Sequence, residues 1–208
     1  LRPLTPWLRI NGRRPRDPHR QPHLHTDAAL DQRPHRMSRS SSVPRKRLEL
    51  LDTSVLLEIL DVPYENDRSA TIAEEFDAKV EAGVSLQIPM ATVLETGAHI
   101  RRIKEGDARR TCARTFTRFL DKTLSGTEPW SFSPFSWDAD VVRALLEGRG
   151  HDYDLERSIG DGVFEIGDLT IIEEWRLTSR NLTHKVYDVD VWTLDATLRG
   201  VVDGLRTR

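Results

Sequence analysis

The chain has 208 residues and a mass of 23.8 kDa, enough for one domain of ordinary size and little more. Hydrophobic residues make up 38% of it, no run of 18 apolar residues occurs, and Cys112 is its single cysteine. We therefore exclude a membrane-spanning helix, an intrachain disulfide and a cysteine-rich zinc site, and we expect a protein of the reducing cytoplasm.

The formal net charge of −2 conceals two parts of opposite charge. Residues 1–47 contain 12 Lys and Arg against 3 Asp and Glu, together with 7 of the 11 prolines, and carry a net charge of +9. Residues 48–208 carry −11. Because the first part is poor in apolar residues, we predict a disordered basic leader at 1–47 and a folded domain at 48–208.

Three interpretations of the leader stay open. A basic arm of this kind can bind RNA, and an organellar transit peptide is likewise rich in Arg and poor in acids. Prolines such as Pro15 and Pro18 argue against the amphipathic helix that a transit peptide needs. We favour the third interpretation, in which Met37 is the true start and residues 1–36 are not part of the native product.

The folded part opens with a strand, a turn and a short helix. Leu48, Leu50 and Leu51 predict a buried strand ending at Asp52, and the apolar pattern at 55–60 predicts a helix that stops before Pro63. A helix over 68–82, a strand over 84–88 and a helix over 90–103 follow.

The second half of the domain continues this alternation. Asp107 is expected to cap a helix over 108–124. An extended segment over 128–136 and a helix over 137–148 follow, and then a long polar loop over 149–167. Asp168 opens an apolar helix over 168–177. A strand over 186–194 and a last helix over 198–205 complete the domain. Strands separated by helices predict an α/β fold, a three-layer sandwich around a mostly parallel sheet.

Four carboxylates are expected at the ligand-binding edge of this sheet, beyond the carboxyl ends of the strands. Asp52 ends the first strand, Glu95 lies in the helix after the second, Asp168 begins the helix after the long loop, and Asp195 follows the last strand. Carboxylates gathered in one place repel one another and take up protons unless a cation joins them. An all-oxygen set favours Mg²⁺ or Mn²⁺ over zinc.

The segments that carry these acids resemble, in order, the motifs of the PIN-domain nucleases. They read LLDTSVL at 50–56, IPMATVLE at 88–95, GDLTII at 167–172 and VWTLD at 191–195. The compact form is similar to the VapC-type toxins of toxin–antitoxin pairs. Two features depart from the family pattern: the connection at 149–167 is long, and Glu173, Glu174 and Trp175 stand where small residues are typical. Asp161 competes with Asp168 as the third acid.

The resemblance implies metal-dependent hydrolysis of RNA. Asp52, Glu95 and Asp168 would hold one or two Mg²⁺ or Mn²⁺ ions, and Asp195 would complete the ring. The hydroxyls of Thr53, Ser54 and Thr193 would orient these ligands or contact a phosphate. RNA would bind to basic residues after Glu95, namely Arg101, Arg102, Lys104, Arg109, Arg110, Arg114 and Arg118. The family also makes an antitoxin partner and a homodimer plausible.

Each acid also fits a purely structural role, and the protein as a whole fits two further functions. Asp52 and Asp168 could be helix caps, Glu95 could be exposed, Asp195 could be a turn residue, and the arginines could be a solvated face. An aspartyl-phosphate phosphatase or phosphotransferase would also place Asp52 at the end of the first strand, but Ser54 stands where its second aspartate is usual. A catalytically silent PIN-like binding module is the third alternative.

Overall fold

The structure is a computed structural model that describes residues 45–148, 153–182 and 186–207. Apart from residues 45–47, the leader lies outside the described residues. The first strand begins at Lys46, so Lys46 and Arg47, which we assigned to the leader, belong to the sheet.

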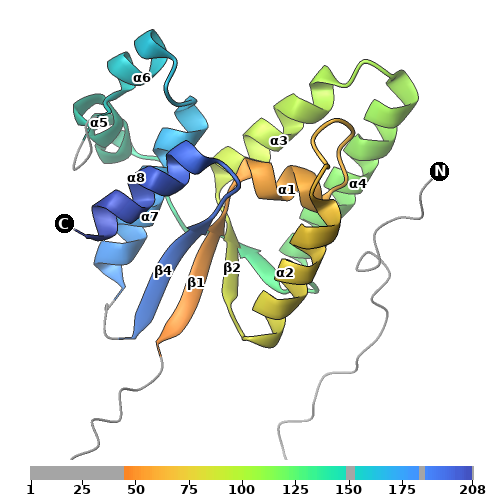
Figure 1. Cartoon of the computed structure of the whole chain (residues 1–208), viewed down its shortest axis with the longest axis horizontal. Helices are drawn as coiled ribbons and strands as arrows, with labels where there is room; N and C mark the ends of the chain where they lie inside the picture. The colour runs from red at the N-terminus through yellow and green to blue at the C-terminus, as the bar shows by residue number, and fades with distance from the viewer. Residues whose placement is uncertain (1–44, 149–152, 183–185, 208) are drawn as a thin grey trace, which may run out of the picture. The chain divides into compact units, whose positions relative to one another are not determined.

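A four-stranded parallel sheet forms the centre of the described domain (Figure 1). Its strands are β1 (Lys46–Leu51), β2 (Ser85–Ile88), β3 (Trp130–Phe132) and β4 (Tyr187–Trp192), in the order β3-β2-β1-β4. Every pairing is parallel. The expectation of an α/β fold around a parallel sheet is therefore confirmed, and β1 lies in the interior of the sheet.

Helices cover the two faces of the sheet. They are α1 (Thr53–Ile59), α2 (Ser69–Glu81), α3 (Met90–Arg102), α4 (Gly106–Leu124), α5 (Ala139–Glu147), α6 (Leu155–Asp161), α7 (Ile166–Asn181) and α8 (Ala196–Arg206). On one face, Leu48, Leu50, Val189 and Val191 pack with side chains of α7 and α8. On the other, Trp130 of β3 contacts Phe76 of α2 and Phe119 of α4, at ring-centroid distances of 5.0 and 4.7 Å.

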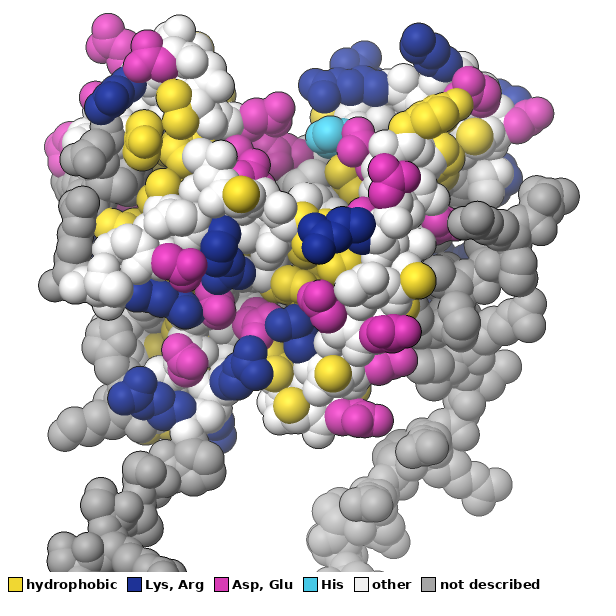
Figure 2. All heavy atoms as spheres, viewed as in Figure 1, with side chains coloured by type: hydrophobic (Ala, Val, Ile, Leu, Met, Phe, Trp, Pro, Cys, Tyr) yellow, Lys and Arg dark blue, Asp and Glu magenta, His cyan; other side chains and the backbone are white. Residues whose placement is uncertain are grey.

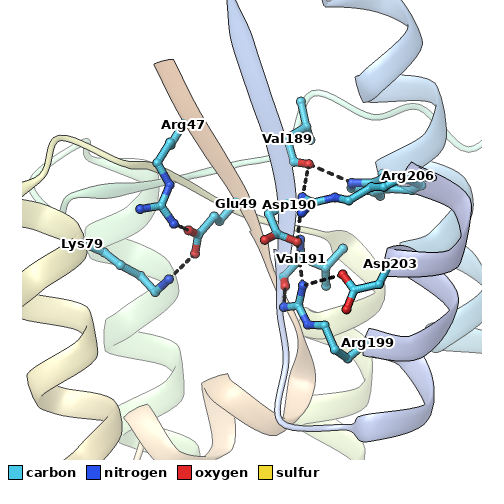
Figure 3. Close-up of polar contacts among 10 residues, drawn as sticks. Arg47, Glu49, Lys79, Val189, Asp190, Val191, Arg199, Asp203 and Arg206 are labelled. Atoms are coloured by element: carbon cyan, nitrogen blue, oxygen red, sulfur yellow. Dashed lines mark hydrogen bonds and ion pairs between the residues drawn. The ribbon is translucent and has the colours of Figure 1, made fainter. Parts of the chain in front are cut away.

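A buried acid interrupts the apolar pattern of β1. Glu49 is 2% exposed, and its carboxylate lies 2.7 Å from Arg47 Nη2 and 2.5 Å from Lys79 Nζ (Figure 3). The Lys79 ammonium also lies over the ring of Trp192, 4.7 Å from its centroid. Two cations thus compensate the buried charge and join α2 to the sheet.

Strand β4 forms one edge of the sheet, and side chains cover two of its outward carbonyls. Trp175 Nε1 and Arg206 Nη2 donate to the Val189 oxygen at 3.0 and 2.6 Å, and Arg199 Nη2 donates to the Val191 oxygen. Asp190 fixes both guanidinium groups, at 2.8 Å from Arg199 and 2.9 Å from Arg206 (Figure 3). Helices α7 and α8 thereby satisfy the free side of this strand.

Three predictions about local structure were wrong. Residues 155–161, which we placed in a long loop, form α6, capped by Asp154 and ended by Gly162 at φ 64°. Helix α4 begins at Gly106, so Asp107 lies in its first turn and is not its cap. Helix α7 begins at Ile166, and Asp168 is its third residue.

No helix within the described ranges is long and apolar enough to cross a membrane.

Candidate active site

Asp52 lies at the carboxyl end of β1, and its side chain is held by three donors. Oδ1 accepts a hydrogen bond from the backbone N of Thr53 at 2.6 Å. Oδ2 accepts from Ser54 Oγ at 2.5 Å and from Thr193 Oγ1 at 2.7 Å. Asp52 is 3% exposed and is also the N-cap residue of α1. The capping role that we considered for it is therefore real, and the same carboxylate also faces the segment after β4.

The hydroxyls of Ser54 and Thr193 connect the ends of β1 and β4. Ser54 Oγ accepts from the backbone N of Leu194 at 3.0 Å, and Thr193 Oγ1 accepts from the backbone N of Asp195 at 2.9 Å. Each hydroxyl therefore receives one hydrogen bond from the chain and donates one to Asp52. This arrangement fits the orienting role predicted for both side chains.

Glu95 projects from α3 toward the end of β1 and the start of α7. Thr53 Oγ1 donates to its Oε2 at 2.8 Å. Burial raises the pKa of Glu95, and the carboxylates of Glu165 and Asp52 raise it further, while the hydrogen bond from Thr53 partly opposes them. A Cβ added to Gly167 would lie 1.8 Å from Oε1 of Glu95. The Glu95 carboxylate thus occupies the space that a side chain at position 167 would need.

The pKa of Asp168 is raised by burial and by the three other carboxylates. Its pKa is raised to about 7, first by burial and then by Asp52, Glu95 and Asp195, whose negative charges disfavour its ionised form. The backbone N of Glu165 donates to its Oδ2 at 3.1 Å and partly opposes the shift. The four predicted acids thus lie close enough to interact.

Asp195 and Asp161 differ in their relation to this group. Asp195 is the N-cap of α8, where its Oδ1 accepts from the backbone N of Thr197 at 2.6 Å and of Leu198 at 3.0 Å. Its charge still raises the pKa of Asp168. Asp161 ends α6, and its carboxylate lies 3.5 Å from Arg157 Nε. The geometry favours Asp168 over Asp161 as the third acid.

The donor set is suited to a hard divalent cation. Among the residues that the structure describes, no three His, Cys, Asp or Glu side chains form a group that could hold a metal ion by themselves. Mg²⁺ usually binds through one or two carboxylates and keeps several waters. Oε1 of Glu95 and Oδ1 of Asp168 accept no hydrogen bond within the described part, so each has an oxygen to offer. The residues therefore fit Mg²⁺ or Mn²⁺ in this partly hydrated mode.

The predicted RNA-binding arginines are exposed on α3 and α4. Arg101 and Arg102 lie in the last turn of α3, and Arg110, Arg114 and Arg118 are solvent-exposed on α4. Figure 2 shows a notch with acidic side chains in its floor, and Lys and Arg side chains at the top of the adjoining α3 and α4. Arg109 donates instead to the Ile103 carbonyl at 3.0 Å, which commits it to the end of α3.

Sequence reasoning missed two residues of this site. Glu165 is the N-cap residue of α7, and its charge raises the pKa of Glu95. Gly167 lies inside the first turn of α7 and provides the space for Glu95. The sequence predicts a loop at Gly167 and gives no sign of its packing against Glu95, which comes from a distant segment.

Comparisons of this chain with protein-family models, curated proteins and solved structures gave no match.

Proposed function

We propose that this chain is a metal-dependent endoribonuclease of the PIN-like type, with Asp52, Glu95 and Asp168 as its metal ligands. The observation that carries the proposal is the grouping of four carboxylates at the carboxyl edge of a parallel sheet. Burial and their electrostatic repulsion together raise the pKa of Asp168. Such a cluster costs free energy in the apo protein, and a bound cation removes that cost. Perturbed acids gathered in one place are typical of functional sites.

The residues of the site have distinct parts in the proposed reaction. Thr53, Ser54 and Thr193 hold the carboxylates of Glu95 and Asp52 in fixed orientations by donating hydrogen bonds to them. A divalent cation bound there would lower the pKa of a water and neutralise charge on the scissile phosphate. Arg101, Arg102 and the α4 arginines would attract the RNA backbone, which the acidic domain otherwise repels.

The alternatives have less support. An aspartyl-phosphate enzyme uses an acid two residues after its nucleophile, and here that position is Ser54, whose hydroxyl donates a hydrogen bond to Asp52. A silent binding module has no use for a group of carboxylates that repel one another. The antitoxin partner and the homodimer stay predictions from the resemblance alone.

The test is an RNA cleavage assay with the full chain. Wild-type protein and the variants Asp52→Asn and Glu95→Gln are incubated with structured and unstructured RNA, with Mn²⁺, with Mg²⁺ or with a chelator. Asp203→Asn is the matched control, because Asp203 is an exposed acid on α8. We expect cleavage that the chelator abolishes, that both site variants lose and that the control retains.

Two results would contradict the proposal. If cleavage persists both with the chelator and in Asp52→Asn, the activity belongs to a contaminant or to another site. Metal-dependent release of phosphate from a small phosphate ester, with no RNA cleaved, would favour the phosphatase alternative.

A further inference from the structure

A pocket lies at the end of the sheet opposite to the acids. Its volume is about 700 Å³, and it is formed at the amino-terminal ends of β1 and β4 with the last turns of α7 and α8. Its walls are made by Arg45, Trp175, Arg176, Ser179, Arg180, Tyr187, Asp188, Val189, Leu205 and Arg206. None of the four acids of the candidate active site lines it.

The charge of this pocket is opposite to that of the surrounding domain. Four of its ten lining residues are arginines and one, Asp188, is an acid. Residues 48–208 as a whole carry a net charge of −11. A concentration of guanidinium groups in a concave site of an acidic domain indicates an anionic ligand.

Two of the arginines are fixed by other contacts and still have an N–H donor without a hydrogen-bond partner among the described residues. Arg176 is 7% exposed and binds Glu173 through Nε and Nη2, at 2.8 and 2.6 Å. Arg206 binds the Val189 carbonyl and Asp190 through Nη2. Nη1 of each guanidinium makes no hydrogen bond within the described part of the chain. Donors fixed in advance cost little entropy when a ligand binds.

The other two arginines have no acidic partner. Arg45 and Arg180 are exposed, and neither forms an ion pair within the described residues. Asp188 lies beyond ion-pair distance of both. Their charges are therefore available to a ligand, and a phosphate group matches the forked geometry of guanidinium.

Two aromatic side chains also line this pocket. Trp175 is 5% exposed and is fixed by its hydrogen bond to the Val189 carbonyl at 3.0 Å. Tyr187 is half-buried, and neither its hydroxyl nor that of Ser179 has a hydrogen-bond partner among the described residues. Aromatic rings are the surfaces on which nucleic acid bases stack.

We propose that this pocket binds a nucleotide through its phosphate monoester, with Arg45 and Arg180 on the phosphate and Tyr187 beside the base. The volume supports a ligand of this size, because small-molecule sites occupy roughly 300–1,000 Å³ and inorganic phosphate alone would leave most of the pocket empty. The phosphate monoester can belong to a free mononucleotide or to the phosphorylated end of an RNA chain. The site is independent of the acids and of any metal.

The experiment measures equilibrium binding to the full chain by titration calorimetry in the presence of a chelator. The ligands are adenosine monophosphate, guanosine monophosphate, adenosine, inorganic phosphate, and a short RNA with and without a terminal phosphate. The test variant is Arg45→Gln/Arg180→Gln, whose two side chains are exposed and can be removed without opening the core. The control is Arg143→Gln, an exposed arginine on α5 that pairs with Asp140. Thermal unfolding verifies that both variants are folded.

We expect the monophosphates to bind at least about tenfold more tightly than adenosine, which lacks the phosphate, or inorganic phosphate, which lacks the base. The double variant should lose at least about tenfold in affinity, and Arg143→Gln should lose none. Preference for the phosphorylated RNA over the mononucleotides would identify an RNA end as the source, and equal affinity would identify the free nucleotide.

Several results would overturn the proposal. They are the absence of binding at millimolar ligand, equal binding of adenosine or inorganic phosphate, and unchanged affinity in the double variant. If the wild-type protein binds the nucleotide but cleaves no RNA, the proposed ribonuclease function fails and the nucleotide site stands, because the two sites share no residue.

Discussion

Gly167 lies against the carboxylate of Glu95, so that a Cβ at position 167 would come within 1.8 Å of Oε1 and 2.2 Å of Cδ. The contact joins α7 to α3 at the point where the acids gather. It also makes the position of Glu95 depend on the absence of a single carbon atom.

Gly167→Ala should therefore displace Glu95 and impair the proposed reaction. We expect a loss of about tenfold or more in metal-dependent RNA cleavage, because a small misplacement of a catalytic group is costly. Overpacking should also lower the free energy of unfolding by about 1–3 kcal/mol. Gly200→Ala is the control, because nothing lies within 4 Å of a Cβ added there. Equal effects of the two substitutions would contradict this account.

The hydroxyls that hold Asp52 give a second prediction. Thr193→Val removes the donor at 2.7 Å from Oδ2 and keeps the shape of the side chain. We expect Mn²⁺ affinity, followed by titration calorimetry, to fall about 10- to 100-fold, as is usual when an outer partner of a metal ligand is lost. Thr197→Val, an exposed position at the start of α8, should bind Mn²⁺ as the wild type does. A tightly bound metal in Thr193→Val would show that this hydrogen bond is dispensable.

Glu174 should make stability depend on pH. Its carboxylate is fully buried, with neither oxygen hydrogen-bonded within the described residues, and burial raises its pKa from 4.5 to about 7. The folded chain therefore keeps a proton that the unfolded chain releases as the pH rises from about 4.5 to 7. The contribution of Glu174 to the free energy of unfolding is therefore lost as the pH rises through that window, by up to about 3 kcal/mol.

Glu174→Gln should abolish this dependence. Urea unfolding should find the variant more stable than the wild type at pH 8 and similar to it at pH 4, since the amide resembles the protonated carboxyl. The exposed Glu81→Gln at the end of α2 provides the comparison. A constant difference in the free energy of unfolding across pH would argue against a buried proton at Glu174.

The Glu173–Arg176 pair allows a further test of buried charge. Both side chains are less than 10% exposed and are joined by two hydrogen bonds. Arg176→Met should lower the free energy of unfolding by about 3–5 kcal/mol, because it leaves a buried carboxylate without a partner. The double variant Glu173→Met/Arg176→Met should recover much of that loss in urea unfolding. Additive losses in the double variant would show that the pair is not coupled.

The strands and the order of the acids could be predicted because their signals are local. An apolar run that ends in Asp52, and a second that ends at Ile88, define parallel strands and the edge they share. The starts of α4 and α7 were misplaced for one reason. We assigned the N-cap to Asp107 and Asp168, which are strong caps, whereas Glu105 and Glu165 precede the helices.

The remaining features depend on contacts between distant segments. Helix α6 has seven residues with few apolar positions, so only Asp154 and Gly162 marked its ends. Leu94 follows the helical apolar pattern of α3 and yet is 62% exposed. The packing of Gly167 on Glu95 and the gathering of Arg45, Arg180 and Arg206 join segments more than 20 residues apart, and sequence spacing carries no sign of them.

The covered edge of β4 has a consequence for self-association. A strand from another molecule can extend a sheet only where backbone carbonyls and amides stand unpaired. Trp175, Arg199 and Arg206 already bind the carbonyls of Val189 and Val191, and a docking strand would have to displace two arginines held by Asp190. Aggregation by sheet extension is thus blocked on this side of the sheet.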